Sequence, residues 1–343
     1  MQAVILAAGK STRTYPLTIT GPKPLLKVAN KTLLEHNLEN LLGFVSEVII
    51  VVGYKKDMIK KYFGDDYKEI KITYAEQKQQ LGTANALLVT KKQIKSRFIL
   101  LMGDDIYSRE DIKKCIKHRY SILTTHVKDP QNFGVVVEKN GILVDFVEKP
   151  EVFVSDKIST AFYLLDEKIF RYIEKIKKSE RDELELPDAI RLLSKHEKIC
   201  CVESKGWLPI AYPWDLLKAD RILRKGKNII GKNSRINGTI KNSTIGKNCK
   251  ISGIVKNSII MDNTSIEKDS VIEDSIIGEH AVFNGKIKSK DNAYSIVNGK
   301  KIKVGRLGAI IADNVRAKNA DIKPGCKIWP NKRIKGEIKN DIA

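Results

Sequence analysis

The chain has 343 residues, of which 42% are hydrophobic and 30% charged, so it is long enough for two domains with substantial cores and too apolar for disorder throughout. Its 62 Lys and Arg residues exceed its 41 Asp and Glu residues, which gives a formal net charge of +21. The lysines are spread along the whole chain between acidic and apolar residues, without an aromatic-interleaved RNA motif. We therefore expect a lysine-rich surface that attracts anionic substrates rather than a nucleic-acid partner.

The cysteines form no CxxC pair and have no regular spacing, which favours reduced thiols over a disulfide framework or a zinc site. They are Cys115, Cys200, Cys201, Cys249 and Cys326. No apolar run approaches the roughly 18 to 20 residues that a membrane span needs, and the N-terminus lacks a basic region followed by an apolar one. We expect a cytoplasmic protein with no membrane partner.

Short β-rich runs alternate with helix-patterned stretches through the first two thirds of the chain. In chain order they are QAVILA, KTLLEHNLENLL, VSEVIIVVGY, DMIKKYFG, GTANALLVTKKQI and RFILLMGDD. Near-continuous apolar strands separated by amphipathic helices predict a mostly parallel sheet covered on both faces, in a Rossmann-like, doubly wound α/β fold. In such sheets ligands bind outside the carboxyl ends of the strands, where the Gly9 loop and the Gly103–Asp105 turn would both lie.

A different pattern begins at about residue 227. Aliphatic residues recur six positions apart, with Gly, Asn, Asp, Ser and Lys between them, at Ile230 and Ile236, at Ile245 and Ile251, and at Ile254, Ile260, Ile266 and Ile272. This period predicts a parallel β-helix with three short faces per coil, in which each of these aliphatic side chains, Ile254 included, points inward. The segment from Lys286 to Lys301 departs from the period, and we expect it to form a loop. The predicted domains are residues 1–226 and 227–343.

The first apolar run ends in the loop LAAGKSTRTYPLTITGPKPLL. A glycine lets the backbone approach a ligand closely, and open backbone N–H groups attract anions, so the loop is a candidate phosphate site. Arg13 and Lys23 are cations near the Gly9 backbone. The Gly-x-x-x-x-Gly-Lys-Ser/Thr and Gly-x-Gly-x-x-Gly patterns are absent, which argues against an ordinary NTPase and against a dinucleotide-dependent dehydrogenase.

Two further stretches add candidates for nucleotide and metal binding. In EQKQQLGTANAL, the Gln77 amide could contact a base edge, and Gly82 and Thr83 open a helix whose N-terminus favours an anionic or polar ligand. In FILLMGDD, Asp104 ends a buried strand, where a carboxylate could bind Mg²⁺ and through it triphosphate oxygens. A turn or capping role is the alternative for this aspartate. Its neighbour Asp105 is the other possible ligand, and we favour Asp104.

The stretch from Asn132 to Leu165 supplies candidates for a sugar phosphate. Gly134 offers backbone groups, Glu148 can accept hydrogen bonds from sugar hydroxyls, and Lys149 can bind a phosphate. A polar turn follows at Ser159 and Thr160.

The motifs LAAGKSTRTYPLT…PKPLL, QLGTANAL, MGDD, FG and FVEKP, in this order, resemble the sugar-1-phosphate nucleotidyltransferase family from Met1 to about Arg224. With the repeats that follow, the chain is most similar to archaeal two-domain members. In these a left-handed β-helix of hexapeptide repeats follows the nucleotidyltransferase domain, and some also acetylate amino sugar phosphates. The resemblance implies Mg²⁺ as cofactor, and a nucleoside triphosphate and a sugar 1-phosphate as substrates. A triangular β-helix has flat faces that can pack side by side around a threefold axis, so we also expect a homo-oligomer, most simply a trimer.

The resemblance also implies roles for individual residues. Arg13 and Lys23 match catalytic residues that bind the phosphates. The nucleotide-binding residues would be Leu6, Ala8, Gly9, Gln77, Gly82 and Thr83; the sugar-phosphate-binding residues would be Gly134, Glu148, Lys149 and Ser159; and Asp104 would bind the metal. The chain departs from the family pattern at Ser11, where many relatives have glycine, and at Pro209, where many have a second metal-binding aspartate. Asp215 could replace that aspartate or cap the helix that follows it.

The reaction implied is attack by a sugar 1-phosphate oxygen on the α-phosphorus of the nucleoside triphosphate, with pyrophosphate leaving. UTP or dTTP is favoured by the archaeal resemblance, and guanylyl transfer to mannose 1-phosphate is an alternative suggested by FVEKPEVFVSDKI. Acetyl transfer on the β-helix is a second hypothesis, for which His280 is the only histidine in that domain, while the family's histidine would fall near Lys268. A third is a regulatory protein that binds nucleotide sugars, because Pro209 replaces an expected aspartate.

Overall fold

The computed structural model describes residues 1–343 and divides the chain into two compact units. We call Met1–Gly9 with Leu34–Leu208 the sheet unit, and Lys10–Leu33 with Pro209–Ala343 the repeat unit. The loop after the first strand is therefore grouped with the C-terminal part of the chain. None of the helices is long and apolar enough to cross a membrane.

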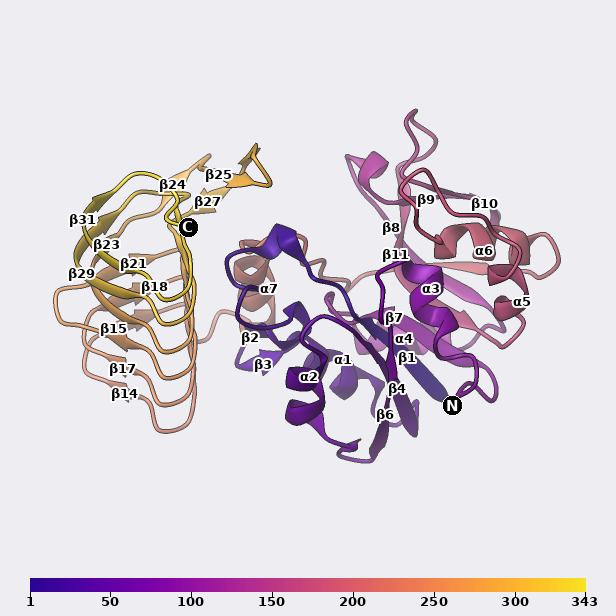
Figure 1. The fold of residues 1–343 in the computed structure, drawn as a ribbon, viewed down its shortest axis with the longest axis horizontal. Coiled ribbons are helices and arrows are strands. Elements are labelled where there is room, and N and C mark those ends of the chain that lie inside the picture. The colour runs from indigo at the N-terminus through magenta and orange to yellow at the C-terminus, as the bar shows by residue number, and fades with distance from the viewer. The chain divides into compact units, whose positions relative to one another are not determined.

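One ten-stranded sheet forms the sheet unit (Figure 1). In spatial order its strands are β5 (Asp66–Tyr67), β6 (Ile70–Glu76), β4 (Glu47–Val52), β1 (Gln2–Ala7), β7 (Phe98–Met102), β11 (Lys157–Leu165), β8 (Ser121–His126), β12 (Cys200–Glu203), β10 (Ile142–Glu148) and β9 (Gly134–Lys139). Its helices are α1 (Leu33–Leu41), α2 (Lys56–Phe63), α3 (Thr83–Leu88), α4 (Arg109–Cys115), α5 (Ile169–Ile173) and α6 (Leu186–Ser194), with a 3₁₀ turn η3 (Pro130–Asn132). Residues of α3, α5 and α6 share one buried apolar cluster with β1, β7, β10 and β11.

Strands β6, β4, β1 and β7 run parallel, and all six residues of β1 are buried, as its continuous apolar run predicts. Beyond β7 the sheet becomes mixed, because β11 is antiparallel to both β7 and β8, and β10 is antiparallel to β9 and β12. The prediction of a mostly parallel sheet is wrong for this half. Asn140 and Gly141, both with positive φ, join β9 directly to β10, and a turn this short can connect only antiparallel strands.

The repeat unit contains two stacks of very short parallel strands, drawn as successive turns in Figure 1. The first stack is β13 (Ile229–Ile230), β16 (Thr244–Ile245), β19 (Ile259–Ile260), β22 (Ile276–Ile277), β28 (Ile310–Ile311) and β30 (Lys327–Ile328). The second contains β14 (Arg235–Ile236), β17 (Lys250–Ile251), β20 (Ser265–Ile266), β23 (Val282–Ile287), β21 (Val271–Glu273), β18 (Ile254–Lys256) and β15 (Thr239–Lys241), with β29 (Arg316–Ile322) and β31 (Arg333–Ile338) attached through β23. These stacks are consistent with a β-helix.

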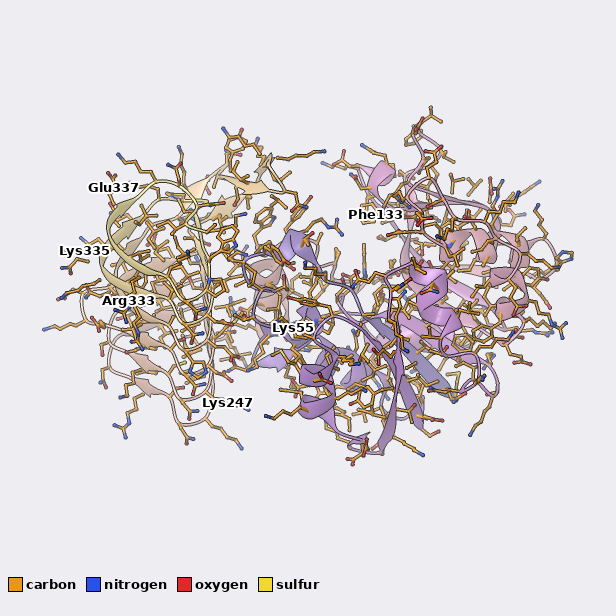
Figure 2. The ribbon with its side chains drawn as sticks, viewed as in Figure 1. Lys55, Phe133, Lys247, Arg333, Lys335 and Glu337 are labelled. Atoms are coloured by element: carbon orange, nitrogen blue, oxygen red, sulfur yellow. The ribbon has the colours of Figure 1, made fainter.

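The remaining elements of this unit are the 3₁₀ turns η1 (Thr12–Thr14) and η2 (Lys23–Leu25), the hairpin of β2 (Lys27–Val28) and β3 (Lys31–Thr32), and helix α7 (Asp215–Arg224). On β31, Ile334 and Ile338 are buried, while Arg333, Lys335 and Glu337 lie on the outside, as Figure 2 shows. Aliphatic side chains thus fill the inside of the turns, and charged side chains cover the outside.

The strand register shows how long each turn is. Ile230 pairs with Ile245 and Ile245 with Ile260, so a turn takes 15 residues here, fewer than three six-residue faces would need. The six-residue step survives between the first and second faces, as from Ile245 to Ile251. On the third face, which the strands β15, β18 and β21 of the second stack form, Val255 is buried and Ile254 is 38% exposed, so the expectation that Ile254 points inward is wrong. Ile230 is also half exposed, because it lies in the first turn and pairs on one side only.

Many corners of the turns are occupied by asparagine with positive φ. Asparagine tolerates this left-handed conformation better than most residues, which explains its abundance between the aliphatic positions. Asn233, Asn248 and Asn263 stack on adjacent turns, and each of the first two donates a side-chain hydrogen bond to the next, at 3.3 and 3.1 Å. The corner residues therefore tie neighbouring turns together.

The segment predicted to be a loop around Lys286–Lys301 contains a hairpin instead. β25 (Tyr294–Val297) pairs with β26 (Lys300–Lys303), and β24 (Lys290–Asp291) pairs with β27 (Arg306–Leu307). The turn is Asn298–Gly299, with φ of 48° and 77°, an Asn-Gly pair that favours tight hairpins. The turns resume afterwards, since Ile276 pairs with Ile310.

Candidate active site

The carboxyl ends of β1, β4 and β7 lie next to one another in the sheet unit. The Gly103 N–H donates to the Leu6 carbonyl at 2.8 Å, which holds the end of β7 against β1. At the end of β4, a Cβ atom on Gly53 would lie 2.9 Å from the Ala8 carbonyl oxygen, so only glycine fits there. Gly9 and Asp104 therefore follow neighbouring parallel strands at one edge of the sheet, where ligands of such sheets bind.

Asp105, the second aspartate after β7, has two hydrogen-bond partners that are distant in the chain. Asp105 accepts a hydrogen bond from the Trp207 indole N–H at 3.0 Å, and its carbonyl accepts one from the Asn37 amide at 2.7 Å. Asp105 therefore helps to hold the turn together, and metal binding by Asp104 stays a prediction. Sequence reasoning did not assign these contacts to Asn37 and Trp207, because both residues are distant from Asp105 in the chain.

Gln77 lies just beyond β6 and is buried. Its side-chain amide donates to the Asn85 side chain at 2.9 Å and to the Gly82 carbonyl at 3.1 Å, so both N–H groups are used. The amide oxygen is left to accept a hydrogen bond. Nearby, the Gln80 amide donates to the Ala8 carbonyl at 2.9 Å, which ties this segment to the end of β1.

Gly82 and Thr83 begin α3, as predicted, and both contact a second segment. Gly82 has a φ of 95°, and a Cβ atom there would lie 2.4 Å from the Leu184 carbonyl oxygen. That carbonyl accepts from the Ala84 N–H at 2.9 Å, and the Thr83 hydroxyl accepts from the Leu186 N–H at 3.1 Å. The start of α3 is thus bonded to residues 184–186, and its Ala84 N–H group is already used.

The sugar-side candidates Gly134, Glu148 and Lys149 are brought together by one strand pair. Gly134 on β9 lies opposite Glu148 on β10, and the Lys149 N–H donates to the Phe133 carbonyl at 2.9 Å. The Lys149 ammonium lies 3.6 Å from the Glu148 carboxylate. A carboxylate and an ammonium group are therefore presented side by side.

Arg181 and Glu185 complete this charged cluster. An Arg181 nitrogen lies 3.6 Å from Glu148 and 2.7 Å from Glu185. Burial raises the pKa of Glu148, while Lys149 and Arg181 act in the opposite direction. Sequence reasoning missed Arg181, because it stands in the charged run KKSERDELE, which is typical of a solvated surface. Since Leu184 contacts the start of α3, residues 181–186 connect the nucleotide-side and sugar-side candidates.

Ser159 is buried in a bulge of β11. Its hydroxyl donates to the Tyr163 hydroxyl at 3.1 Å and accepts from the Ala161 N–H at 2.9 Å. Ala161 has a φ of 58°, in the region where the register of β11 against β8 shifts. These contacts give Ser159 a structural role in shaping the bulge, and sugar-phosphate binding by Ser159 stays a prediction.

The remaining candidates, Arg13, Lys23 and Asp215, belong to the repeat unit. Arg13 is exposed on η1, and Lys23 is buried on η2. Ser11, which replaces a glycine of many relatives, has left-handed φ and ψ of 53° and 55°. Its carbonyl accepts hydrogen bonds from the Thr14 and Thr18 hydroxyls at 2.7 and 3.0 Å, and these bonds hold a conformation that serine rarely adopts.

Asp215 is the first residue of α7, and one of its oxygens accepts from the Ala211 and Tyr212 N–H groups at 2.8 and 2.7 Å. Burial raises the pKa of Asp215, against the opposing effects of these bonds and of Lys23. Ala211 and Tyr212 precede the helix, so these contacts hold the turn before α7 and do not cap the helix itself. The role of Asp215 as a second metal ligand stays a prediction.

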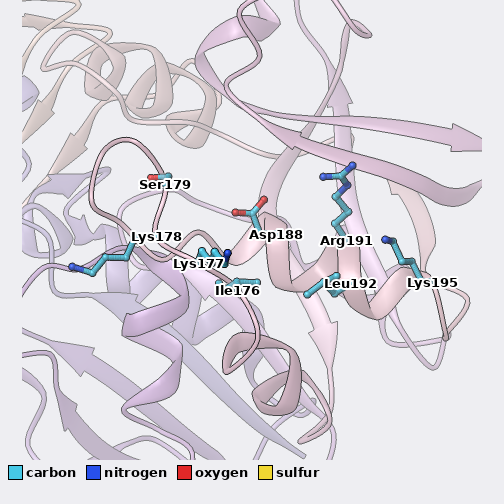
Figure 3. A pocket seen from close by; sticks show the side chains of 8 residues that line it. All are labelled: Ile176, Lys177, Lys178, Ser179, Asp188, Arg191, Leu192 and Lys195. Atoms are coloured by element: carbon cyan, nitrogen blue, oxygen red, sulfur yellow. The ribbon is translucent and has the colours of Figure 1, made fainter.

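A pocket of about 370 Å³ lies elsewhere in the sheet unit, between the connection after α5 and the helix α6 (Figure 3). It is lined by Ile176, Lys177, Lys178, Ser179, Asp188, Arg191, Leu192 and Lys195. None of the predicted site residues lines it. Ser179, which lines the pocket, donates a hydrogen bond to the Glu185 carboxylate of the charged cluster at 3.2 Å.

Comparison with known proteins decides the family. The sequence model described as "Nucleotidyl transferase" matches residues 2–226, well over half of the chain. The chain belongs to the nucleotidyl transferase family. A second model, "GMPPB C-terminal domain", matches residues 222–342. Enzymes of the nucleotidyl transferase family generally use a divalent metal.

Two curated archaeal relatives agree with this assignment. The "Bifunctional protein GlmU" of Methanocaldococcus jannaschii is 36% identical, over 96% of this chain and 92% of that protein. The "UTP--glucose-1-phosphate uridylyltransferase AglF" of Haloferax volcanii is 35% identical, over 66% of this chain and 97% of that protein. The resemblance to sugar-1-phosphate nucleotidyltransferases noted in the sequence is thereby confirmed, and this nucleotidyl transferase is an enzyme of that class.

Among solved structures, a UDP-glucose pyrophosphorylase in complex with UDP-glucose has a TM-score of 0.60 and 23% sequence identity, covering 66% of this chain and 99% of that one. At this identity the likeness bears on the fold alone. It supports the Rossmann-like α/β fold expected for the N-terminal part of this nucleotidyl transferase.

Proposed function

We propose that this nucleotidyl transferase joins a sugar 1-phosphate to UTP or dTTP, giving a nucleotide sugar and pyrophosphate. The observation that carries the proposal is the edge of the sheet where the Gly9 loop and Asp104 follow two neighbouring parallel strands, β1 and β7. The preference for a uridine or thymidine nucleotide is supported by the uridylyltransferase named among the relatives. The test is a matrix of nucleoside triphosphates against sugar 1-phosphates, measured by pyrophosphate release.

Mg²⁺ fits the residues that are present. Nowhere in the chain do three or more His, Cys, Asp or Glu side chains form a metal-binding group, so there is no all-protein cage. Mg²⁺ is usually held by one or two carboxylates together with substrate phosphates. A single strand-end carboxylate such as Asp104 matches that requirement. We propose that Asp104 holds Mg²⁺, with Asp215 as a further ligand.

When bound, the metal would neutralise charge on the triphosphate. The remaining steps depend on residues of the chain. The nucleophile is already an anionic phosphate oxygen near neutral pH, so no general base is needed. Arg13 and Lys23 would offset the repulsion between the two anionic substrates and the charge on the leaving pyrophosphate. Glu148 would accept hydrogen bonds from sugar hydroxyls, and Lys149 would bind the sugar phosphate.

The orientation of the Gln77 amide leads to a prediction about the base. Because its N–H groups are used by Asn85 and Gly82, its oxygen would accept from a base. At the ring nitrogen of the pairing edge uracil, thymine and guanine have an N–H donor, whereas adenine and cytosine have an acceptor there and donate only through the adjacent exocyclic amino group. We expect turnover with UTP or dTTP and little with ATP or CTP. Gln77→Leu should reduce this discrimination roughly tenfold, the value of one hydrogen bond.

The matched control is Gln79→Leu, an exposed amide two residues away. It should leave the ratio of kcat/KM values for UTP and CTP unchanged. Equal turnover of all four nucleotides by the unaltered enzyme would contradict the role of Gln77.

We also propose that residues 1–226 form the nucleotidyltransferase domain and residues 227–343 a left-handed β-helix of hexapeptide-like repeats. The bounds of the two matching family models and the parallel stacks of short strands support this division. We propose that the enzyme works in the cytoplasm, which its five free cysteines support.

Assembly gives a further prediction. A stack of short coils has flat faces, and closed rings saturate contacts between such faces, so we expect a homotrimer. Light scattering at micromolar concentration should give three times the mass of one chain. A monomer at that concentration would refute the prediction.

Acetyl transfer remains a second candidate, because the relative from Methanocaldococcus jannaschii is named as bifunctional. His280 is exposed at a corner between turns, with a φ of 58°. If it is a general base, acetyl transfer from acetyl-CoA to an amino sugar phosphate should be measurable and should be lost in His280→Ala.

A further inference from the structure

The β2–β3 hairpin, which follows the phosphate-binding candidates Arg13 and Lys23 in the chain, is bonded to the repeat turns. The Asn30 amide donates to the Ile245 carbonyl at 2.7 Å. The Lys27 ammonium donates to Asp262 at 2.7 Å and to Glu279 at 3.0 Å. All of these contacts lie within the repeat unit, at the ends of three successive strands of the first stack, β16, β19 and β22.

A fourth turn contributes in the same way, since the Thr20 hydroxyl donates to Asp313 at 2.5 Å, just beyond β28. Lys23 stands between Thr20 and Lys27 in the chain. The segment that carries this candidate phosphate ligand is therefore bonded to the turns on both sides.

Asp262 and Asp313 occupy equivalent corners, and in both the two carboxylate oxygens bind the same kinds of partner. One oxygen of Asp262 accepts from the Lys247 N–H at 2.8 Å, and its other oxygen binds Lys27. One oxygen of Asp313 accepts from the Glu279 N–H at 2.7 Å, and its other oxygen binds Thr20. Each aspartate is thus fixed by the preceding turn and holds a residue of the 20–30 segment with its second oxygen.

The ion pair between Lys27 and Asp262 is largely shielded from solvent. The side chains of Lys27 and Asp262 are only 19% and 15% exposed. Burial alone would lower the pKa of Lys27, but its bonds to Asp262 and Glu279 outweigh this effect and the pKa is raised. Removing one partner of a shielded pair leaves the other charge uncompensated, so the segment should lose its fixed position when either is changed.

The turn of the hairpin is held separately. The Ala29 N–H donates to Asp220 of α7 at 2.8 Å, and Asp220 also accepts from the Thr244 hydroxyl at 2.6 Å and pairs with Arg224. These bonds would keep the hairpin attached if the Lys27 contacts were lost, so a Lys27 variant should loosen the segment without unfolding the unit.

We infer that Lys27, with its partners Asp262 and Glu279, is a positioning residue by which the repeat turns hold the phosphate-binding segment in its nucleotide-binding conformation. This inference rests on the proposed function. A segment that is already ordered binds its ligand without first paying the cost of ordering. If the competent conformation were populated about one time in ten, the apparent affinity for nucleotide would fall roughly tenfold. Saturating nucleotide would restore the conformation, so kcat would change little.

The test compares Lys27→Met, Asp262→Asn and the double variant in the full chain, with UTP as nucleotide. Asp262→Asn keeps an oxygen for the Lys247 N–H and removes the charge that faces Lys27. We expect each single variant to raise the KM for UTP roughly tenfold with kcat within about twofold of the unaltered enzyme. The KM of the double variant should not exceed the higher of the two single-variant KM values, because the two residues act as one pair.

Lys323→Met is the matched control. Lys323 also bridges two carboxylates, Asp321 at 2.8 Å and Glu337 at 3.0 Å, but on β29 and β31, without a contact to the hairpin. Its KM for UTP should stay unchanged.

Three outcomes would overturn the inference: an unchanged KM in Lys27→Met, a fall in kcat with unchanged KM, which would indicate loss of folded enzyme, or an equal rise in KM in Lys323→Met. Calorimetric titration with UTP repeats the comparison without turnover, and Lys27→Met should bind roughly tenfold more weakly. If the unaltered chain neither binds UTP nor releases pyrophosphate, the proposed function itself fails. If it does both and Lys27→Met matches it, only the positioning role fails.

Discussion

Asp104→Asn should lose turnover by roughly 10³-fold or more while the protein keeps its fold. The substitution keeps the size of the side chain at the end of β7 but removes the charge that would hold the metal, and a metal contributes several kcal/mol to charge stabilisation in such reactions. Pyrophosphate release should be measured over a range of Mg²⁺ concentrations, with thermal melting to verify the fold.

The neighbouring carboxylate provides the control. In Asp105→Asn the amide oxygen can still accept from the Trp207 indole, so most of the rate should remain. If Asp104→Asn kept most of the Mg²⁺-dependent rate, the metal assignment would be wrong. Loss of turnover in Asp105→Asn alone would move the assignment to Asp105.

The second large effect should come from the cations of the N-terminal loop. Arg13→Ala and Lys23→Ala should each reduce the rate roughly 10²-fold or more, the scale of removing one preorganised charge from a developing anion. Steady-state kinetics should separate their roles. A residue that acts in the transition state lowers kcat, whereas one that only binds substrate raises KM.

Lys10→Ala is the control for these two variants, because Lys10 is exposed in the same loop and has no assigned role. It should leave kcat/KM within about threefold of the unaltered enzyme, since a solvated charge contributes little. If Arg13→Ala and Lys23→Ala behaved like Lys10→Ala, the loop would not be a phosphate-binding element.

The site shows what local sequence can and cannot indicate. Gly9, Asp104 and Glu148 stand where strands end, so apolar runs followed by polar residues were enough to predict their place at strand ends. The hydrogen bond between Asp105 and Trp207, about a hundred residues away in the chain, could not be predicted from the sequence. Arg181 could not be separated from other surface charges, because its contact with Glu148 exists only after β10 and the 181–186 segment come together.

The repeats also show what the local sequence can and cannot indicate. The six-residue step predicted short parallel strands, and Ile245, Ile251, Ile260 and Ile266 are buried accordingly. The length of the third face of each turn could not be predicted, because a regular spacing of aliphatic residues does not indicate which corner of the turn is shorter. Val255 therefore replaced Ile254 as the inward residue.

By itself the sequence determined the strands, the strand-end candidates, the stacked turns and the family, because apolar periodicity and local motifs are properties of neighbouring residues. Tertiary structure alone decided the mixed half of the sheet, the structural role of Asp105 and the attachment of the β2–β3 hairpin to the repeat turns. Lys27 and Asp262 lie 235 positions apart, and each alone reads as an ordinary surface charge. Only the stacking of successive turns brings the two side chains together and shields them from water, so that removing one would leave the other charge uncompensated.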